Sequence, residues 1–278
     1  MKISFLGTGA AEGVPAMFCN CEYCKKIREL GESEFRTRSQ VLIDGILSVD
    51  FPPEAYAHSL KHNYNFTDLK YLLVTHSHMD HFYAHDFILR GYKYAEVKTP
   101  VLEIYGNGEV LKVFSECTRR EMKPTVAPNV VLHKIAPYRV FNVGEYKVMT
   151  VAAQHSQEET CLLFYIERNG RGYLHMYDTG RVEDKAFEFL AKNGAKANLV
   201  AIDCTFLEYT AGEKSRHMGI EDDMTMKEKL LNAGVIDKTT QIVITHFSHN
   251  GNPTRAHTQQ IAQKYNVTAA YDGYETEI

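Results

Sequence analysis

Three histidines and one aspartate fall within a stretch of six residues that directly follows the apolar run Tyr71–Val74. A short, uninterrupted apolar run predicts a buried strand. Side chains alternate along an extended chain, so His76 and His78 project to one side, and Asp80 and His81 follow where the chain must bend toward a second point. Imidazole nitrogens and carboxylate oxygens are ligands of zinc, manganese and iron in hydrolytic sites. The loop therefore predicts two ligands for each of two adjacent metals, and a metal-free polar turn is the alternative.

The spacing H-x-H-x-D-H, present here from His76 to His81, resembles the signature of the metallo-β-lactamase superfamily of hydrolases. The resemblance implies an α/β fold, the four-layer αββα sandwich, with a dinuclear metal site at one edge. It also implies three further ligands, which are a histidine, an aspartate and a histidine, each placed after a later strand.

Three strands predicted later in the chain are each followed by a residue of the required type. They are Tyr146–Val151 before His155, Tyr173–Tyr177 before Asp178, and Gln241–Thr245 before His246. By the resemblance, one metal is bound by His76, His78 and His155, the other by Asp80, His81 and His246, and Asp178 bridges the two. The alternative role for Asp178 is the N-cap of a helix predicted to start near Glu183.

A separate metal site is predicted near the N-terminus. The pattern C-x-C-x-x-C brings Cys19, Cys21 and Cys24 into one turn, and three thiolates together suit a closed structural zinc site that takes a fourth ligand from elsewhere. Three buried or free thiols are the alternative. These cysteines are too crowded for a tidy disulfide framework. The remaining cysteines are most simply buried small apolar residues; they are Cys117, Cys161 and Cys204.

Several motifs occur in a fixed order along the chain. They are Gly7-Thr8-Gly9, Gly13-Val14-Pro15, the cysteine turn, the histidine loop, Asp203-Cys204, the segment Thr245 to His249, and Tyr271-Asp272-Gly273. This set resembles the phosphoribosyl cyclic phosphodiesterases of the carbon–phosphorus lyase pathway. The resemblance implies that His249 is the fourth ligand of the structural zinc and that His217 is a catalytic histidine. A surface loop histidine is the alternative for His217.

Two segments are longer than in that family: the stretch between His81 and His155, and the loop that carries Lys214 and Arg216 just before His217. Both can shape a substrate pocket. The identity of the substrate is therefore less constrained by the resemblance than the chemistry is.

The expected activity is hydrolysis of a small, cyclic phosphodiester, such as a phosphoribosyl cyclic phosphate. Two catalytic divalent metals, Mn²⁺ or Zn²⁺, would lower the pKa of a shared water and supply hydroxide at neutral pH, next to one structural Zn²⁺. His217 would donate a proton to the leaving oxygen, and we take Asp80 to be a catalytic residue as well.

Other functions use the same metal ligands. A tRNA 3′-end endonuclease shares them, but it needs a basic arm for phosphates, and this chain has no such arm and a net charge of −4. Another ester hydrolase of the same fold remains an alternative. The third alternative is a metal-binding module without catalytic activity. The presence of the full set of candidate ligands argues against it.

The rest of the chain predicts one domain over residues 1–278, because strands and helices alternate without a linker. A helix is expected over Phe82–Tyr94, and Asp50 at the end of a predicted strand either braces the histidine loop or simply turns the chain. No apolar stretch is long enough to span a bilayer, and the apolar N-terminus is too short for a signal peptide, so we expect a cytoplasmic protein without membrane partners. A homodimer is left open.

Overall fold

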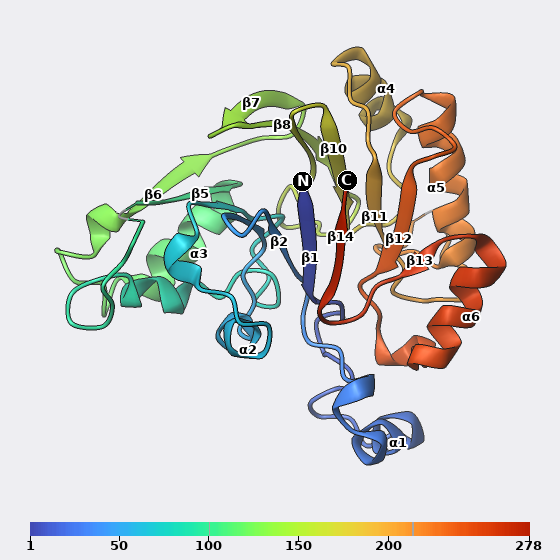
Figure 1. The fold of residues 1–278 in the computed structure, drawn as a ribbon, viewed down its shortest axis with the longest axis horizontal. Helices are drawn as coiled ribbons and strands as arrows, with labels where there is room; N and C mark the ends of the chain where they lie inside the picture. The colour runs from blue at the N-terminus through green and yellow to red at the C-terminus, as the bar shows by residue number, and fades with distance from the viewer. Residues whose placement is uncertain (100, 213) are drawn as a thin grey trace.

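The fold is an αββα sandwich, seen in a computed structural model that describes residues 1–99, 101–212 and 214–278. Two mixed β-sheets pack face to face, and helices cover the outer face of each sheet (Figure 1). The four-layer architecture predicted from the sequence is confirmed.

The first sheet is built from the N-terminal half of the chain and from its last strand. In spatial order it contains β14 (Tyr274–Glu277), β1 (Lys2–Gly7), β2 (Gln40–Ile43), β3 (Leu47–Val49), β4 (Tyr71–Leu73), β5 (Leu102–Gly106) and β6 (Val130–Lys134). Neighbours from β14 to β3 are antiparallel, and those from β3 to β6 are parallel. Helices α2 (Ala55–Lys61) and α3 (Gly108–Thr118) pack on its outer side.

The second sheet is built from the C-terminal half. Its order is β13 (Thr268–Ala269), β12 (Gln241–Thr245), β11 (Leu199–Asp203), β10 (Arg171–Met176), β9 (Leu162–Arg168), β8 (Tyr146–Ala152) and β7 (Arg139–Val143). Neighbours from β13 to β10 are parallel, and those from β10 to β7 are antiparallel. Helices α4 (Asp184–Lys192), α5 (Ile220–Asn232) and α6 (Arg255–Tyr265) lie on its outer side.

Strand β9 shows why the central strands read as continuous apolar runs. Leu162, Phe164 and Ile166 belong to the core between the two sheets, and Leu163 and Tyr165 belong to the core under the outer helices. A strand covered on both faces has no solvent side, so polar residues are not needed at alternate positions. This double burial fixes the strand ends that carry the candidate site.

The prediction of a helix over Phe82–Tyr94 was wrong. A short 3₁₀ helix covers only Ala84–Leu89, and the chain then passes through left-handed conformations at Gly91 and Tyr92, with φ values of 131° and 56°. An α-helix cannot continue through residues in that region. The interleaved aromatic residues imitate a helical pattern, but they follow an irregular segment.

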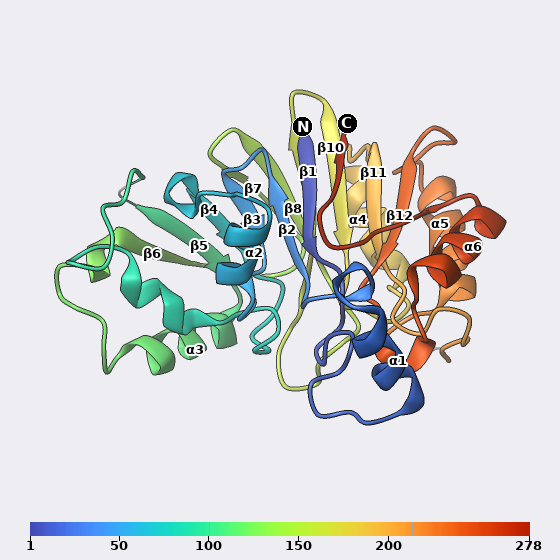
Figure 2. The ribbon, with the colours of Figure 1, turned by 60° about the horizontal axis from the view of Figure 1, so that its bottom comes forward.

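Several elements of the fold were not predicted from the sequence. Helix α1 (Glu22–Leu30) begins within the cysteine turn, directly after Cys21, and projects from the sandwich (Figure 2). Strands β7 and β14 were also missed, and β14 returns the C-terminus to the side of β1. Among the helices of the described residues, none is long and apolar enough to cross a membrane.

Candidate metal centre and active site

The loop after β4 carries the first four predicted ligands. Its turn is closed by hydrogen bonds from the backbone N–H groups of His81 and Phe82 to the carbonyl oxygen of His78, at 3.0 and 2.9 Å. The turn reverses the chain after the two alternating histidines and places Asp80 and His81 at a second point, as the spacing predicts. His76, Asp80 and His81 are buried.

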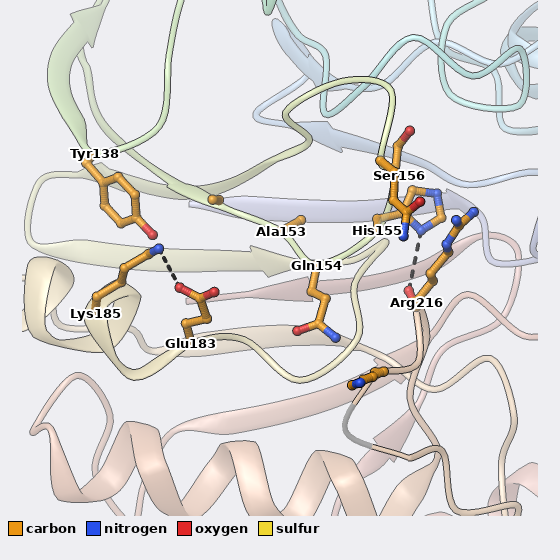
Figure 3. A pocket seen from close by; sticks show the side chains of 11 residues that line it. Tyr138, Ala153, Gln154, His155, Ser156, Glu183, Lys185 and Arg216 are labelled. Atoms are coloured by element: carbon orange, nitrogen blue, oxygen red, sulfur yellow. Dashed lines mark hydrogen bonds and ion pairs between the residues drawn. The ribbon is translucent and has the colours of Figure 1, made fainter.

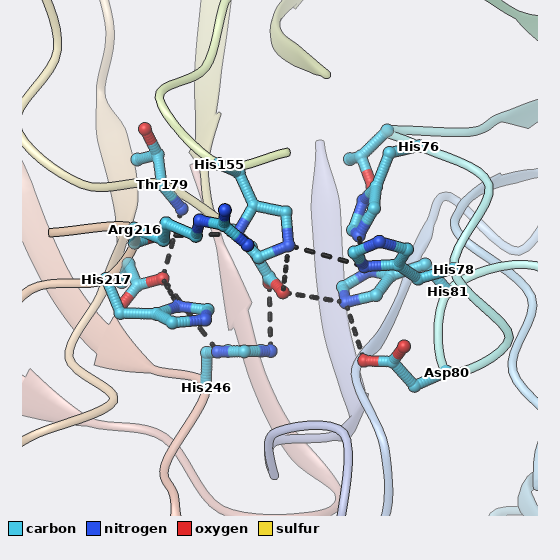
Figure 4. Close-up of polar contacts among 12 residues, drawn as sticks. His76, His78, Asp80, His81, His155, Thr179, Arg216, His217 and His246 are labelled. Atoms are coloured by element: carbon cyan, nitrogen blue, oxygen red, sulfur yellow. Dashed lines mark hydrogen bonds and ion pairs between the residues drawn. The ribbon is translucent and has the colours of Figure 1, made fainter. Parts of the chain in front are cut away.

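A first group of ligand atoms comes from three histidines. Nε2 of His76 lies 2.9 Å from Nδ1 of His78, which lies 3.4 Å from Nε2 of His155. His155 belongs to the loop after β8, in the opposite sheet, and faces the histidine loop across the edge of the sandwich (Figure 4). The three nitrogens converge within 4.8 Å of one another.

A second group is fully buried and contains Asp80, His81, Asp178 and His246. Nε2 of His81 lies 3.2 Å from Oδ2 of Asp80 and 3.1 Å from Oδ2 of Asp178. The other oxygen of Asp178 lies 2.8 Å from Nε2 of His246. Oδ2 of Asp178 also lies 3.9 Å from Nε2 of His155, so this carboxylate stands between the two groups. Its position is the one that a bridging ligand needs, although bridging itself stays a prediction.

The two groups fit divalent cations. Nε2 of His246 and Oδ1 of Asp178 are buried and have no hydrogen-bond partner, despite their short separation. Burial lowers the pKa of His81, but the negative charges of Asp178, Asp80 and Asp50 outweigh burial and raise that pKa well above its usual value. Two carboxylates buried beside imidazole nitrogens, without well-formed hydrogen bonds at these atoms, make a site in which a bound cation would be stabilising.

Each buried ligand histidine is oriented by a hydrogen bond to its second ring nitrogen. Oδ2 of Asp50 lies 2.6 Å from Nδ1 of His81, and the other oxygen accepts from the backbone N–H of Thr75 at 2.8 Å. The Thr75 hydroxyl lies 3.0 Å from Nδ1 of His76. Such contacts fix the direction in which a ligand nitrogen points. Of the two roles considered for Asp50, the contacts therefore fit bracing of the histidine loop rather than a simple chain turn.

His217 lies beside both groups. It precedes α5, and its ring stacks on that of His246, with centroids 5.4 Å apart, and lies 4.9 Å from the ring of His155. Oδ2 of Asp203, at the end of β11, lies 2.9 Å from Nδ1 of His217. The hydroxyl of Thr205 donates to Oδ1 of Asp203 at 2.8 Å and lies 2.8 Å from Nδ1 of His246. Asp203 and Thr205 thus hold two histidines in a fixed relation.

The charge state of His217 follows from these contacts. Burial lowers its pKa, but the charge and hydrogen bond of Asp203 outweigh burial and raise the pKa to about 9. The contact with Asp203 therefore favours the protonated form of His217. Because Nδ1 faces Asp203, Nε2 is the nitrogen left for a substrate.

One glycine allows the His217 loop to come this close. A Cβ atom at Gly180 would lie 1.9 Å from the carbonyl oxygen of Ser215. Gly180 closes the turn that begins at Asp178, so the absence of a side chain there lets the two loops approach each other.

Glu159 was not among the residues predicted from the sequence. Its carboxylate accepts hydrogen bonds from the backbone N–H and the hydroxyl of Ser77 and from the side-chain amide of Asn107. Asn107 also caps α3, because its side-chain oxygen accepts from the N–H of Val110. Glu159 and Ser77 are distant in the sequence, and no local pattern joins them.

The predicted structural zinc ligands also meet. Cys19, Cys21, Cys24 and His249 offer ligand atoms within 4.8 Å of one another, and Sγ of Cys24 lies 3.4 Å from Nδ1 of His249. Cys21 is the N-cap of α1, and its sulfur accepts from the N–H of Cys24. The geometry suits tetrahedral binding of one zinc, which stays a prediction. All six cysteines are free thiols here.

One short segment contributes residues to both candidate metal sites. His246 enters the buried histidine and aspartate group, and His249 enters the cysteine group. Between them, the hydroxyl of Ser248 donates to Oε1 of Glu12 at 2.6 Å. A cavity of about 260 Å³ opens above this segment. Its lining includes Glu12, His78, Asp80, His155, Asp178, His217 and His246.

A family model matches most of the chain. The model describes a β-lactamase superfamily domain and matches residues 39–247, from β2 to the loop that holds His246. No curated protein sequence matches significantly.

Several solved structures have a similar fold. A diphosphatase from the PhnP family has a TM-score of 0.73 at 19% identity, covering 100% of this chain and 97% of that chain. Zn²⁺-bound PqqB from Methylobacterium extorquens has a TM-score of 0.72 at 18% identity, with 100% of both chains covered. The short form of human tRNase Z has a TM-score of 0.71 at 18% identity, covering 100% of this chain and 99% of that chain. With the family match and the αββα fold, the chain belongs to the metallo-β-lactamase superfamily and is a metal-dependent hydrolase.

Proposed function

We propose that this hydrolase cleaves a small phosphodiester, and the observation that carries the proposal is the placement of His217. This histidine lines the same cavity as the predicted metal ligands and is held there by the buried carboxylate of Asp203. A charged donor beside a metal centre suits a reaction that releases an alkoxide, because the leaving oxygen needs a proton.

Two divalent cations fit the ligand set. One would be held by His76, His78 and His155, the other by Asp80, His81 and His246, with Asp178 between them. When bound, such a pair activates water and neutralises the charge that develops on phosphoryl oxygens. Mixed nitrogen and oxygen ligands accept zinc, manganese or iron. A zinc held by Cys19, Cys21, Cys24 and His249 would have a structural role.

The protein groups perform the remaining tasks. Nε2 of His217 donates its proton to the leaving oxygen as that oxygen separates from phosphorus. Asp203 keeps His217 protonated before the reaction and oriented during it. Thr205 connects Asp203 with His246, so the position of the proton donor is tied to the position of a metal ligand.

The size and charge of the site favour a small substrate. The cavity has a volume of about 260 Å³, which is small for a ligand pocket, and the whole chain carries a net charge of −4. A polynucleotide ligand would require many phosphate contacts from lysine and arginine. A tRNA substrate is therefore the weaker candidate, although human tRNase Z has a similar fold.

The test is turnover by manganese-loaded and zinc-loaded protein on three substrates. They are bis(p-nitrophenyl) phosphate, a ribonucleoside 2′,3′-cyclic phosphate, and a nucleoside diphosphate, the last because a similar fold belongs to a diphosphatase. We expect hydrolysis of both phosphodiesters, lost on chelation and restored by metal. Loaded protein that cleaves only the diphosphate, or none of the three, would overturn the phosphodiesterase proposal.

Metal content is counted on the same samples. We expect about three metals per chain when loaded and about one after chelation, since a site with three thiolates holds zinc more tightly than the mixed site. This count separates a poorly loaded enzyme from an inactive one.

A further inference from the structure

Glu12 lines the cavity of about 260 Å³ at the predicted metal ligands, called the catalytic cavity below, but it belongs to neither candidate metal site. It lies in the loop after β1. In this loop the backbone N–H of Ala10 donates to the carbonyl oxygen of Phe247 at 3.0 Å, and the N–H of Phe247 donates to that of Thr8 at 2.9 Å. These bonds hold the loop beside the segment that carries His246, so the loop forms one wall of the cavity.

Two neighbours fix the carboxylate of Glu12. The hydroxyl of Ser248 donates to its Oε1 at 2.6 Å and accepts from the backbone N–H and the side-chain amide of Asn250, at 3.2 and 3.1 Å. Nε2 of His249 lies 3.9 Å from the same Oε1, while Nδ1 of His249 lies 3.4 Å from Sγ of Cys24. The side chain of Glu12 still keeps 33% of its surface exposed. A carboxylate is thus held in place and remains accessible to a ligand.

Few other charges face a ligand in this cavity. Apart from the predicted metal ligands, Glu12 and His217 are the charged side chains among the described residues that line it, and none of those residues is a lysine or an arginine. Lys185 and Arg216 line a neighbouring cavity of about 420 Å³, which shares His155 with this one (Figure 3). A bound phosphoryl group therefore meets positive charge from the metals and His217, and negative charge from Glu12.

This arrangement acts differently on the two kinds of phosphate ester. A phosphodiester carries a single negative charge at neutral pH, whereas a phosphate monoester carries about 1.5 to 2. Like charges repel each other, and they do so more strongly in a partly buried site than in water. Since no lysine or arginine of the described lining neutralises the additional charge, the carboxylate of Glu12 disfavours the monoester more than the diester.

From this geometry we infer that Glu12 makes the catalytic cavity select phosphodiesters over phosphate monoesters. The inference rests on the proposed phosphodiesterase function and names a specificity-determining residue for it. Glu12 acts through its charge and transfers no proton. The same repulsion favours product release, because hydrolysis of a diester converts it into a monoester with more negative charge.

The test measures the binding of two ligands that differ by one charge and contain no ester bond. They are phenylphosphonate and methyl(phenyl)phosphinate, in which a methyl group replaces one phosphonate oxygen. Both are titrated by calorimetry into metal-loaded protein at slightly alkaline pH, where the phosphonate is a dianion. In Glu12→Gln the dissociation constant of the phosphinate divided by that of the phosphonate should rise by at least about fivefold. This change corresponds to about 1 kcal/mol, the interaction of two unit charges about 4 Å apart in bulk water.

Two further variants separate the charge of Glu12 from other effects. Glu188→Gln removes the same charge from an exposed position on α4 outside the cavity and should keep the wild-type ratio. Glu12→Asp keeps the charge on a shorter side chain and should stay closer to the wild-type ratio than Glu12→Gln does. An unchanged ratio in Glu12→Gln, an equal rise in Glu188→Gln, or an equal rise in Glu12→Asp would each overturn the inference.

Turnover gives a second readout. The kcat/KM for bis(p-nitrophenyl) phosphate divided by that for p-nitrophenyl phosphate should fall in Glu12→Gln by a similar factor, and an unchanged quotient would contradict the role of Glu12 in selectivity. If the loaded enzyme cleaves no phosphodiester but the dissociation constants shift as expected, the proposed function fails and the effect of Glu12 on ligand charge stands. If phosphodiesters are cleaved but the ratio of dissociation constants is the same in wild type and Glu12→Gln, the inference about Glu12 fails alone.

Discussion

The carboxylate of Glu159 accepts hydrogen bonds from both the backbone N–H and the hydroxyl of Ser77. The backbone N–H of Ser77 lies 3.1 Å from each carboxylate oxygen, and its hydroxyl donates to Oε1 at 2.6 Å. Ser77 stands between His76 and His78, and Glu159 belongs to the loop that begins with His155. One side chain therefore links the two loops that supply the predicted ligands of one metal.

The first prediction concerns this link. Glu159→Ala should weaken metal binding at the three-histidine group by about 10- to 100-fold, because groups that orient ligands have effects of that size. Metal affinity is measured by competition with a chelator. Glu159→Gln, which keeps one acceptor oxygen, should recover part of the affinity, and Glu158→Ala at the exposed neighbouring position should have no effect. Unchanged affinity in Glu159→Ala would refute the role.

The second prediction assigns the proton donor. His217→Ala should retain both catalytic metals and lose about 10²- to 10⁴-fold in kcat, which is the usual contribution of a general acid. His257→Ala is the control, since this histidine pairs with Glu208 away from the cavity. Full activity in His217→Ala, with metal content verified, would show that another group supplies the proton.

The third prediction concerns the pH dependence of catalysis by His217. Asp203 raises the pKa of His217 to about 9 against the opposing effect of burial. The acid form is lost as the pH rises through this value, so kcat/KM should fall on the alkaline side. Nearby cations lower the pKa, which makes pH 9 the upper limit for the midpoint. Asp203→Asn should move this fall to lower pH. An unchanged pH profile would show that Asp203 does not raise the pKa of the proton donor.

The fourth prediction concerns acid stability away from the metals. His58 is buried between Gln40 and Thr37, and burial lowers its pKa to about 3. The unfolded chain, with a pKa near 6.5, binds a proton that the folded chain does not. Stability is therefore complete above pH 6.5 and declines as the pH falls toward 3, by about 2 kcal/mol between pH 7 and 5 for this single group.

The measurement is urea unfolding of wild-type protein and His58→Gln at pH 7 and pH 5. The variant should show a smaller loss of stability between the two values, because glutamine does not titrate. All other histidines are the same in both proteins, so their contributions cancel. An identical loss in both proteins would mean that His58 is not the group responsible.

The fifth prediction tests the cysteine group. Cys24→Ser should lose the zinc that resists chelation, and its melting temperature should fall by at least about 2–4 °C, the shift expected for about 1 kcal/mol in a chain of this size. Catalytic metal affinity should fall too, because His249 and His246 share one short segment. Cys117→Ser, outside every predicted site, should keep its zinc. Retention of that zinc by Cys24→Ser would exclude the cysteine as a ligand.

The sequence was sufficient where the chemistry is local. Strand periodicity and a tight turn predict the directions of the side chains between His76 and His81. The structure places these four side chains in two groups, as predicted. His155, Asp178 and His246 were found because each follows a strand in the order that the family resemblance implies. Apolar periodicity misled at Phe82–Tyr94, where the aromatic residues suggest a helix but the backbone at Gly91 and Tyr92 is left-handed.

Other features depended on the tertiary structure. Three groupings join residues from different elements of the fold: Glu159 with Ser77, Asp203 with His217, and Lys185 with Lys214 and Arg216. No periodic pattern encodes such contacts, because they depend on how two sheets pack and where their strands end. The sequence by itself indicated the candidate metal ligands, through short-range spacing and the family resemblance, and that resemblance implied the fold class. Only the packed sandwich decided which loops meet at its edge, because those loops are far apart along the chain and are held together by side-chain contacts between them.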